Sequence, residues 1–265
     1  MLEHFRKAQQ AQVRRLLALE KNRALPASYA GERLPFAAGL KSGGENSVFP
    51  VIAEYKRASP SKGAINLAAG PEEIAALYAS CGACAISVLT EEENFMGHLS
   101  YLQRMARAGL PLLRKDFLVH PLQVTETAST PASALLLIVR MLDAGALAAM
   151  LRRALECGLE AVLEVFDPED LRRAREVLRE TGAQPAIIQV NNRDLQFMRV
   201  DETISRQLIK YRADGEIWIS ASGITRRQEV EERLKLGYDA VLAGTALMSS
   251  RNPGETLAQL TGLQR

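Results

Sequence analysis

Cysteine is scarce in this chain, and its scarcity excludes two kinds of stabilised fold. Only three cysteines occur among 265 residues. With Cys157 alone beyond the pair Cys81 and Cys84, neither a disulfide framework nor a four-cysteine zinc site is available. The pair has the C-x-x-C spacing of thiol redox proteins, but it runs from the end of a predicted helix into a predicted strand. We therefore expect buried, reduced thiols.

Aromatic residues and excess charge are also in short supply. Aromatic side chains are 5% of the chain, too few to suggest a stacking platform for bases, and the net charge is only +2. Three histidines (His4, His98 and His120) lie far apart without the spacing of metal ligands, so we expect solvated or capping histidines and no metal. The composition predicts a small-molecule partner and no nucleic acid.

Long apolar runs are missing as well. No run approaches the roughly 20 residues that a membrane span needs, and the amino terminus has no signal-peptide core. Hydrophobic residues make up 47% and charged residues 24%, as in globular proteins. We expect a cytoplasmic enzyme without membrane contact, either a monomer or a weak homodimer.

Short apolar runs alternate with helical patterns along most of the chain. The runs are 51–56, 84–89, 111–115, 134–139, 161–165, 186–191, 217–220 and 240–244. The helical patterns include 71–80, 146–156, 168–180, 226–236 and 254–263. About eight strands alternating with helices predict an α/β fold with a parallel sheet closed into a (β/α)8 TIM barrel. A doubly wound open sheet is the alternative, although no G-x-G-x-x-G follows the first strand.

The first 46 residues precede this alternation. Leu2, Phe5, Val13, Leu16 and Leu17 stand at helical spacing among polar residues and predict an amphipathic helix over 2–22. A glycine-rich loop is expected at 41–46. We interpret residues 1–265 as one barrel domain, with 1–46 as a helical extension at its amino terminus.

Charged side chains stand where the first predicted strand ends. Glu54 and Lys56 are two residues apart, so they project from the same side of the strand. Residues 59–63, Ser-Pro-Ser-Lys-Gly, follow as a polar loop suited to an anion. An active site and a charged edge strand running into a turn are both compatible with this segment taken alone.

Other strand ends carry complementary groups. Lys115 ends the third strand, Glu164 the fifth, and Asn191 and Arg193 the sixth. In a barrel the carboxyl ends of the strands meet at one mouth, where lysine and glutamate together are suited to acid–base chemistry. Asn191 can bond a hydroxyl, and Arg193 offers a fork for a carboxylate. A structural ion-pair network is the competing interpretation.

Glycines follow the last two predicted strands. Gly223 comes after the seventh, and Gly244 with Thr245 after the eighth. Barrels often bind phosphate at these two positions through backbone N–H groups. Either glycine alone could serve a simple turn, but the two together predict a phosphate site.

With these residues in place, the chain resembles the indole-3-glycerol phosphate synthase family of tryptophan biosynthesis. The matching segments are IAEYKRASPSKG from Ile52, AISVLTEEENFMGHLSYL from Ala85, PLLRKDFLVHPLQV from Pro111, LLLIVRML from Leu135, LEVFD from Leu163, QVNNRDL from Gln189 and DAVLAGTALM from Asp239. They occur in the family's order over almost the whole chain. The resemblance implies a carboxy-lyase that converts a carboxyphenylamino-deoxyribulose phosphate into indole-3-glycerol phosphate, with loss of carbon dioxide and water and without a cofactor.

The resemblance also implies a role for each matching residue. Lys115 is similar to the general acid that protonates the ketone oxygen, and Glu164 to the group that shuttles a proton during dehydration. Lys56 resembles the ammonium that contacts substrate anions, while Glu54 and Asn191 bind hydroxyls or complete the proton network. Substrate binding is implied for Ser59, Arg193 and Ser222, and phosphate binding for Gly223, Gly244 and Thr245.

Two departures from the family pattern leave an alternative open. After the seventh strand the family usually reads Glu-Ser-Gly-Ile, whereas this chain has Ala221 in place of the glutamate. Residues 129–133 also replace the usual Gly-Ala-Asp before the fourth strand. The alternative is a weakly active or inactive paralogue or variant that binds a related phosphate ester or a partner protein.

Overall fold

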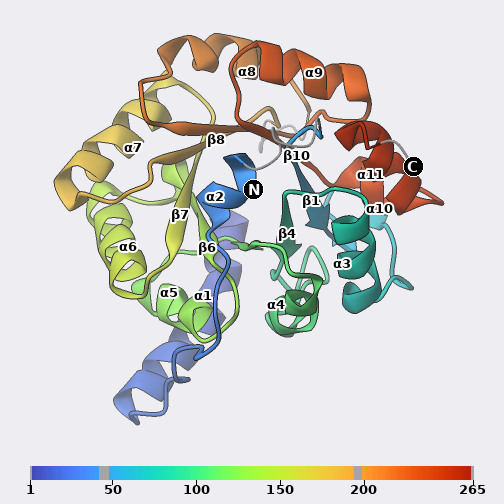
Figure 1. Cartoon of the computed structure of the whole chain (residues 1–265). Coiled ribbons are helices and arrows are strands. Elements are labelled where there is room, and N and C mark those ends of the chain that lie inside the picture. Colours follow the sequence, from blue (N-terminus) through green and yellow to red (C-terminus); the bar gives the residue numbers. More distant parts are fainter. Residues whose placement is uncertain (1, 42–47, 194–198, 264–265) are drawn as a thin grey trace.

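Parallel strands close into a barrel surrounded by helices (Figure 1). The computed structural model describes residues 2–41, 48–193 and 199–263. In this part of the chain the strand order around the barrel is β1-β10-β9-β8-β7-β6-β5-β4, so the last strand pairs with the first. The predicted barrel is confirmed and the open sheet is excluded. The loop expected at 41–46 lies almost entirely outside the described residues.

The strands match the predicted apolar runs to within one or two residues. They are β1 (Val51–Tyr55), β4 (Ala85–Leu89), β5 (Leu112–Lys115), β6 (Ala134–Ile138), β7 (Glu160–Val165), β8 (Ile187–Asn191), β9 (Ile217–Ala221) and β10 (Ala240–Ala243). Strands buried on both faces read as continuous apolar runs, which is why the sequence pattern located them so closely.

Two of the described helices precede the first strand, and the others follow strands and form the outer layer (Figure 1). They are α1 (Leu2–Lys21), α2 (Phe36–Lys41), α3 (Pro71–Ser80), α4 (Ser100–Met105), α5 (Pro121–Ala128), α6 (Ala144–Glu156), α7 (Pro168–Thr181), α8 (Thr203–Leu208), α9 (Arg227–Lys235), α10 (Thr245–Met248) and α11 (Pro253–Thr261). A small hairpin of β2 (Ala58–Ser59) and β3 (Gly63–Ala64) follows β1.

Capping residues set the ends of the long helices. The Asp167 side chain accepts a hydrogen bond from the Asp170 N–H at the start of α7, and Pro168 occupies the first turn. Gly182, in the left-handed conformation, ends that helix. Asp143 caps α6 in the same way, so this helix begins two residues earlier than its apolar pattern indicates.

Helix α1 packs on the barrel through a face that is partly polar. Phe5 and Leu16 are buried as predicted, but Leu17 is 43% exposed, so the predicted stripe is wrong at that position. Gln9 lies on the buried face, where its side-chain oxygen accepts a hydrogen bond of 2.6 Å from Gln123 of α5. The Gln9 amide shows that hydrogen-bonded polar side chains also occupy the buried face, which apolar spacing does not predict.

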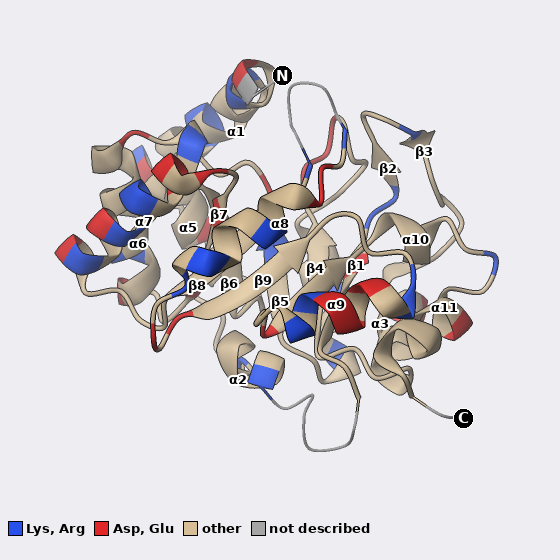
Figure 2. Ribbon diagram, turned by 90° about the horizontal axis from the view of Figure 1, so that it is seen from above, with Lys and Arg blue, Asp and Glu red and all other residues tan. Residues whose placement is uncertain are grey.

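Helix α2, which the sequence analysis missed, lies at the amino-terminal end of the barrel. The Glu160 carboxylate at the start of β7 accepts hydrogen bonds from the backbone N–H groups of Phe36 (3.0 Å) and Ala37 (2.7 Å). Figure 2 shows α2 at one end of the barrel and the β2–β3 hairpin toward the other. The hairpin therefore marks the mouth where the strands end.

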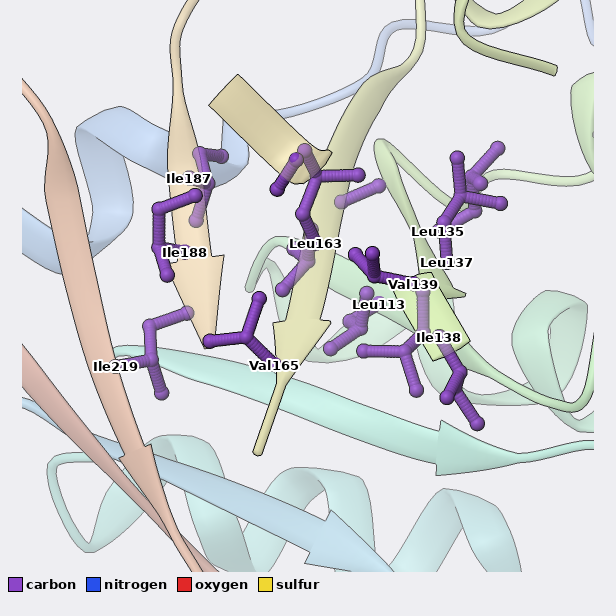
Figure 3. Close-up of a cluster of buried hydrophobic side chains, with 14 of the residues drawn as sticks. Leu113, Leu135, Leu137, Ile138, Val139, Leu163, Val165, Ile187, Ile188 and Ile219 are labelled. Carbon is purple, nitrogen blue, oxygen red and sulfur yellow. The ribbon is translucent and has the colours of Figure 1, made fainter. Parts of the chain in front are cut away.

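Aliphatic side chains of the strands and helices form the core. Figure 3 shows leucine, isoleucine and valine residues from β5 to β9 packed together, among them Leu163, Val165 and Ile188. Trp218 is fully buried in the same cluster. Because Glu164 and Gln189 point into the barrel, the neighbouring Leu163, Val165 and Ile188 face the surrounding helices, and this close-packed layer provides a rigid frame.

The minor predictions from composition have mixed outcomes. Cys81 and Cys84 are buried free thiols, as expected, and Cys157 is half-buried. His120 caps α5, with its Nδ1 accepting a hydrogen bond from the Leu122 N–H. In the described part of the chain, no helix is long and apolar enough to cross a membrane.

Candidate active site

A cavity of about 390 Å³ opens at the carboxyl ends of the barrel strands. Every residue that the sequence analysis assigned to a site lines it, namely Glu54, Lys56, Ser59, Lys115, Glu164, Asn191, Arg193, Ser222, Gly223, Gly244 and Thr245. Strand register explains the convergence, because Asn191 on β8 pairs level with Ala221 on β9, and Leu89 on β4 with Lys115 on β5. The geometry brings these residues together, while the role of each stays a prediction.

The buried carboxylate of Glu54 lies between two lysines. Its Oε1 accepts a hydrogen bond of 2.6 Å from Lys56 Nζ, and its Oε2 lies 3.8 Å from Lys115 Nζ. Burial alone would raise the pKa of the Glu54 carboxyl, but the charges of Lys56, Lys115 and Arg193 outweigh it and hold that pKa below its usual 4.5. Glu54 is therefore ionised and links the two cations.

Gly244 gives the Glu54 side chain its space. A Cβ added to Gly244 would lie 2.9 Å from Glu54 Cδ, far inside van der Waals contact. The sequence predicts a phosphate contact at this glycine, or a simple turn if it is taken alone. Its backbone also lines the cavity, but the first requirement at this position is the carboxylate packed against it.

The residues on either side of Lys115 belong to a buried ion cluster. Arg114 is fully buried, and its guanidinium lies 3.1 Å from both Asp116 Oδ2 and Glu126 Oε2. Thr127 Oγ1 accepts a further bond of 3.0 Å from Arg114. Because these partners fix the backbone on both sides of Lys115, the end of β5 is rigid.

Glu164 lies in the barrel interior beside an amide. Its Oε2 accepts a hydrogen bond of 2.5 Å from Gln189 Nε2 on β8, the residue paired with it in the sheet. Both side chains are buried. Glu164 makes no ion pair with a described residue, so a structural ion-pair network, the competing interpretation, does not apply to this carboxylate.

Asn191 is fixed from two directions at the end of β8. Its Oδ1 accepts hydrogen bonds of 2.9 Å from the Arg193 backbone N–H and from Ser222 Oγ. Ser222 and Gly223 have left-handed φ angles of 70° and 88°. This turn carries Ser222 and Gly223 to the cavity wall beside Asn191.

The hairpin after β1 forms one side of the mouth. Ser59, Pro60, Ser61 and Lys62 line the cavity, and the segment contains β2 and β3 where the sequence indicated only a polar loop. The Ala58 N–H donates to the Phe95 carbonyl at 3.2 Å, so the hairpin is attached to the loop after β4.

An aromatic wall faces the charged side chains, and the sequence analysis missed it. Phe5 of α1 stacks on Phe117 with ring centroids 3.9 Å apart and an interplanar angle of 7°. The Phe95 ring lies against both, with its centroid 6.3 Å from that of Phe5 and 6.0 Å from that of Phe117. The three rings line the cavity. Phe117 follows Lys115 by two residues, which is a local signal, but nothing local indicates Phe5 or Phe95.

The two departures from the family pattern lie in different places. Ala221 is buried and lines the cavity beside Asn191, so the missing carboxylate concerns the site itself. Residues 129–133 precede β6, at the amino-terminal end of the barrel, and do not line the cavity. Only the first departure bears on chemistry.

Among residues 2–41, 48–193 and 199–263, no group of three or more His, Cys, Asp or Glu side chains could hold a metal ion. The cavity is lined by three lysines, one arginine, three buried carboxylates and an apolar wall; the charged residues are Lys56, Lys62, Lys115, Arg193, Glu54, Asp116 and Glu164. The fold and this site define a (β/α)8-barrel protein equipped for acid–base chemistry on a partly aromatic substrate.

Comparison with known proteins narrows this class to one family. The model of the family "Indole-3-glycerol phosphate synthase" matches residues 2–260. The indole-3-glycerol phosphate synthase of Aquifex aeolicus is 43% identical over 215 residues, 80% of this chain and 81% of that protein. Indole-3-glycerol phosphate synthase 2 of Streptomyces coelicolor is 39% identical over 251 residues, 94% and 93% of the two chains. The chain belongs to the indole-3-glycerol phosphate synthase family.

The fold also has distant structural relatives. The 3-hexulose-6-phosphate synthase of Salmonella typhimurium superposes with a TM-score of 0.63 over 81% of this chain and 97% of its own, at 16% identity. This likeness supports the barrel fold.

Proposed function

We propose that the chain synthesises indole-3-glycerol phosphate from 1-(2-carboxyphenylamino)-1-deoxyribulose 5-phosphate, and that the residues of the cavity bind this substrate and transfer its protons. The observation that carries the proposal is the ionised Glu54 between Lys56 and Lys115 at the mouth of a barrel of this family. A binding protein gains nothing from two cations on one buried carboxylate, whereas acid–base chemistry requires groups of both kinds.

The substrate lies across the mouth between two unlike sides. Its aryl ring packs on the wall of Phe5, Phe95 and Phe117, which supplies apolar contact and stacking. Its phosphate lies at Gly223, Gly244 and Thr245, where β9 and β10 end. This arrangement places the ketone of the sugar chain between the ring and the phosphate, near the lysines.

Ring closure uses Lys115 as the acid. The ring carbon that bears the carboxylate attacks the ketone carbon, and the ketone oxygen takes a proton from the Lys115 ammonium as the carbon–carbon bond forms. Lys56 contacts the substrate carboxylate and is held in place by Glu54. Carbon dioxide then leaves, and the electrons of its bond restore the aromatic ring.

Dehydration uses Glu164. A proton leaves the carbon beside the ring nitrogen, and a proton joins the departing hydroxyl, so water is lost and the second double bond of the indole forms. One Glu164 oxygen accepts the hydrogen bond from Gln189. The other oxygen can carry the proton from the substrate carbon to the departing hydroxyl. Asn191 binds a substrate hydroxyl, and Ser59 and Arg193 complete the binding wall.

A direct assay tests the proposal against the alternative. Purified protein with the carboxyphenylamino substrate is expected to form an indole chromophore and one carbon dioxide per product. A protein that binds phosphate but forms no product would favour the alternative, a paralogue that binds a related ester, which Ala221 keeps open.

The Ala221→Glu variant separates the two further. A restored carboxylate that makes one transition-state hydrogen bond is expected to raise turnover by about one to two decades. Ala221→Gln is the matched control, because it fills the same space without the charge. If Ala221→Glu stays folded and binds phosphate but is no faster, the chain is adapted to another task.

The organisation of the chain is also a proposal. We infer one barrel domain with residues 1–46 as its extension, supported by the burial of Phe5 in the cavity wall and by the hydrogen bonds from α2 backbone N–H groups to Glu160. A monomer or weak homodimer and a cytoplasmic location stay predictions, and sedimentation of the purified chain tests the first.

A further inference from the structure

Two adjacent asparagines end β8 and face opposite sides of the barrel wall. Asn191 lines the cavity, whereas Asn192 is fully buried behind it and does not. Successive residues of an extended chain point in opposite directions, which accounts for the division. Asn192 was given no role from the sequence, and the mechanism above does not use it.

Asn192 joins three segments through its side chain. Its Oδ1 accepts hydrogen bonds from Ser205 N–H (3.0 Å) and Ser205 Oγ (2.7 Å), at α8. Its Nδ2 donates to the Ser222 carbonyl (3.1 Å), after β9. A backbone N–H only donates and a carbonyl only accepts, so the orientation of this amide is fixed by its partners. A side chain with one acceptor end and one donor end is required here.

The hydrogen bond to the Ser222 carbonyl fixes the peptide between Ser222 and Gly223. In a trans peptide the C=O and the N–H point in opposite directions. Because Asn192 draws the carbonyl to the buried side, the Gly223 N–H is turned toward the cavity side. No described residue accepts a hydrogen bond from this N–H. Ser222 is held in a left-handed conformation, which a non-glycine residue adopts at a cost, so the peptide needs such an anchor.

We propose that Asn192 is a positioning residue that aims the Gly223 N–H at the substrate phosphate. The inference rests on the proposed phosphate position at Gly223. Asn192 acts through the peptide that it anchors and does not contact the substrate. Its loss frees the Ser222 carbonyl to turn, and the N–H donor is then no longer preset for the anion.

Calorimetric titration of the full chain with two probes tests this role without depending on turnover. Inorganic phosphate reports on the Gly223 end of the cavity, and 2-aminobenzoate reports on the aromatic wall. Asn192→Ala is expected to raise the dissociation constant of phosphate about tenfold to a hundredfold, as for loss of a hydrogen bond to a charged group. The constant for 2-aminobenzoate should change less than about twofold, because its wall is untouched.

Ser205→Ala is the matched control. It removes a buried hydroxyl bonded to the same Asn192 oxygen but leaves the bond to the Ser222 carbonyl, so phosphate affinity should be nearly retained. Equal weakening of both probes in Asn192→Ala, or of phosphate in both variants, would show general loosening and overturn the inference. Unchanged phosphate affinity in Asn192→Ala would overturn it too.

A measurement on the unmodified chain covers the case in which Asn192→Ala does not fold. In protein labelled with ¹⁵N-glycine, the Gly223 amide resonance is expected to shift on addition of inorganic phosphate. A resonance that stays in place while phosphate binds refutes the role of Asn192. If the chain makes no product but its phosphate binding still depends on Asn192, the synthase proposal is wrong and the role of Asn192 is supported.

Discussion

The ends of β1 and β5 each carry a lysine beside an acidic residue, but the charged side chains are arranged differently. On β1, Glu54 and Lys56 face the same side and bond to each other at 2.6 Å. On β5, Arg114 and Asp116 bond to each other at 3.1 Å, and Lys115 between them faces the mouth. The Lys115 ammonium donates no hydrogen bond to a described residue and lies 3.8 Å from Glu54. Lys56 is therefore paired with the acid two residues before it, whereas Lys115 is available for proton transfer.

The largest expected effect is on catalysis, at Lys115. A positioned acid contributes about 10² to 10⁴ in rate, so Lys115→Ala is expected to lower kcat by that factor while phosphate still binds. Lys115→Arg is the control, because it keeps the charge but does not release a proton near neutral pH. Steady-state kinetics measures both. Full activity in Lys115→Ala would transfer the acid role to Lys56.

The next effect is on stability, at Arg114. Arg114→Met leaves Asp116 and Glu126 buried without their shared cation, which is expected to cost about 3 to 5 kcal/mol in the free energy of unfolding. Arg172→Met on α7 breaks ion pairs that are exposed, so its cost in the free energy of unfolding should be much smaller. Urea unfolding compares the two. Similar losses would mean that the β5 cluster does not hold the strand end.

Lys56→Ala is expected to have a smaller effect on kcat than Lys115→Ala. Removal of Lys56 leaves Glu54 with Lys115 as its lysine partner, and the carboxylate closes on that ammonium from 3.8 Å. Lys115 is then bonded to Glu54 and no longer free to donate its proton. We therefore expect kcat to fall about tenfold, the equivalent of one hydrogen bond to a charged group. The double variant should be no slower than Lys115→Ala alone. A further multiplicative loss in the double variant would contradict this coupling.

The smallest effect is the pH dependence of stability at Glu54. Its pKa is lowered in the folded chain, so the unfolded chain binds the proton more readily. The resulting stability is fully present above the unfolded value near 4.5 and is lost as the pH falls through the lower folded value. Unfolding of the wild type and Glu54→Gln in urea between pH 7 and pH 3 should therefore show the difference between them shrinking below pH 4.5. A constant difference would rule out the ionic role.

Part of the site can be predicted from short segments of the sequence, and part of it cannot. Glu54, Lys115 and Asn191 could be placed because each ends an apolar run, and barrel topology brings strand ends together. Phe5 could not, because its contact with Phe117 joins residues far apart in the chain. Helix α2 was missed because six residues between loops give too little periodicity.

The same limit applies to residues that act from behind the cavity. Asn192 is the neighbour of Asn191 and has the same side chain. Only the direction of that side chain decides whether it holds the Ser222 carbonyl or lines the cavity. Leu17 shows a different limit. Its spacing correctly predicted a helix, but its side chain is exposed where the apolar pattern predicted burial.

The contact between Gly244 and Glu54 constrains how this barrel can evolve. A Cβ at 244 would lie 2.9 Å from Glu54 Cδ and 3.0 Å from Glu54 Cβ, so a substitution there displaces the side chain of residue 54. That displacement alters the contacts through which Glu54 joins Lys56 and Lys115. A change at 244 is therefore also a change in the charged group at the mouth, and the two positions are expected to vary together.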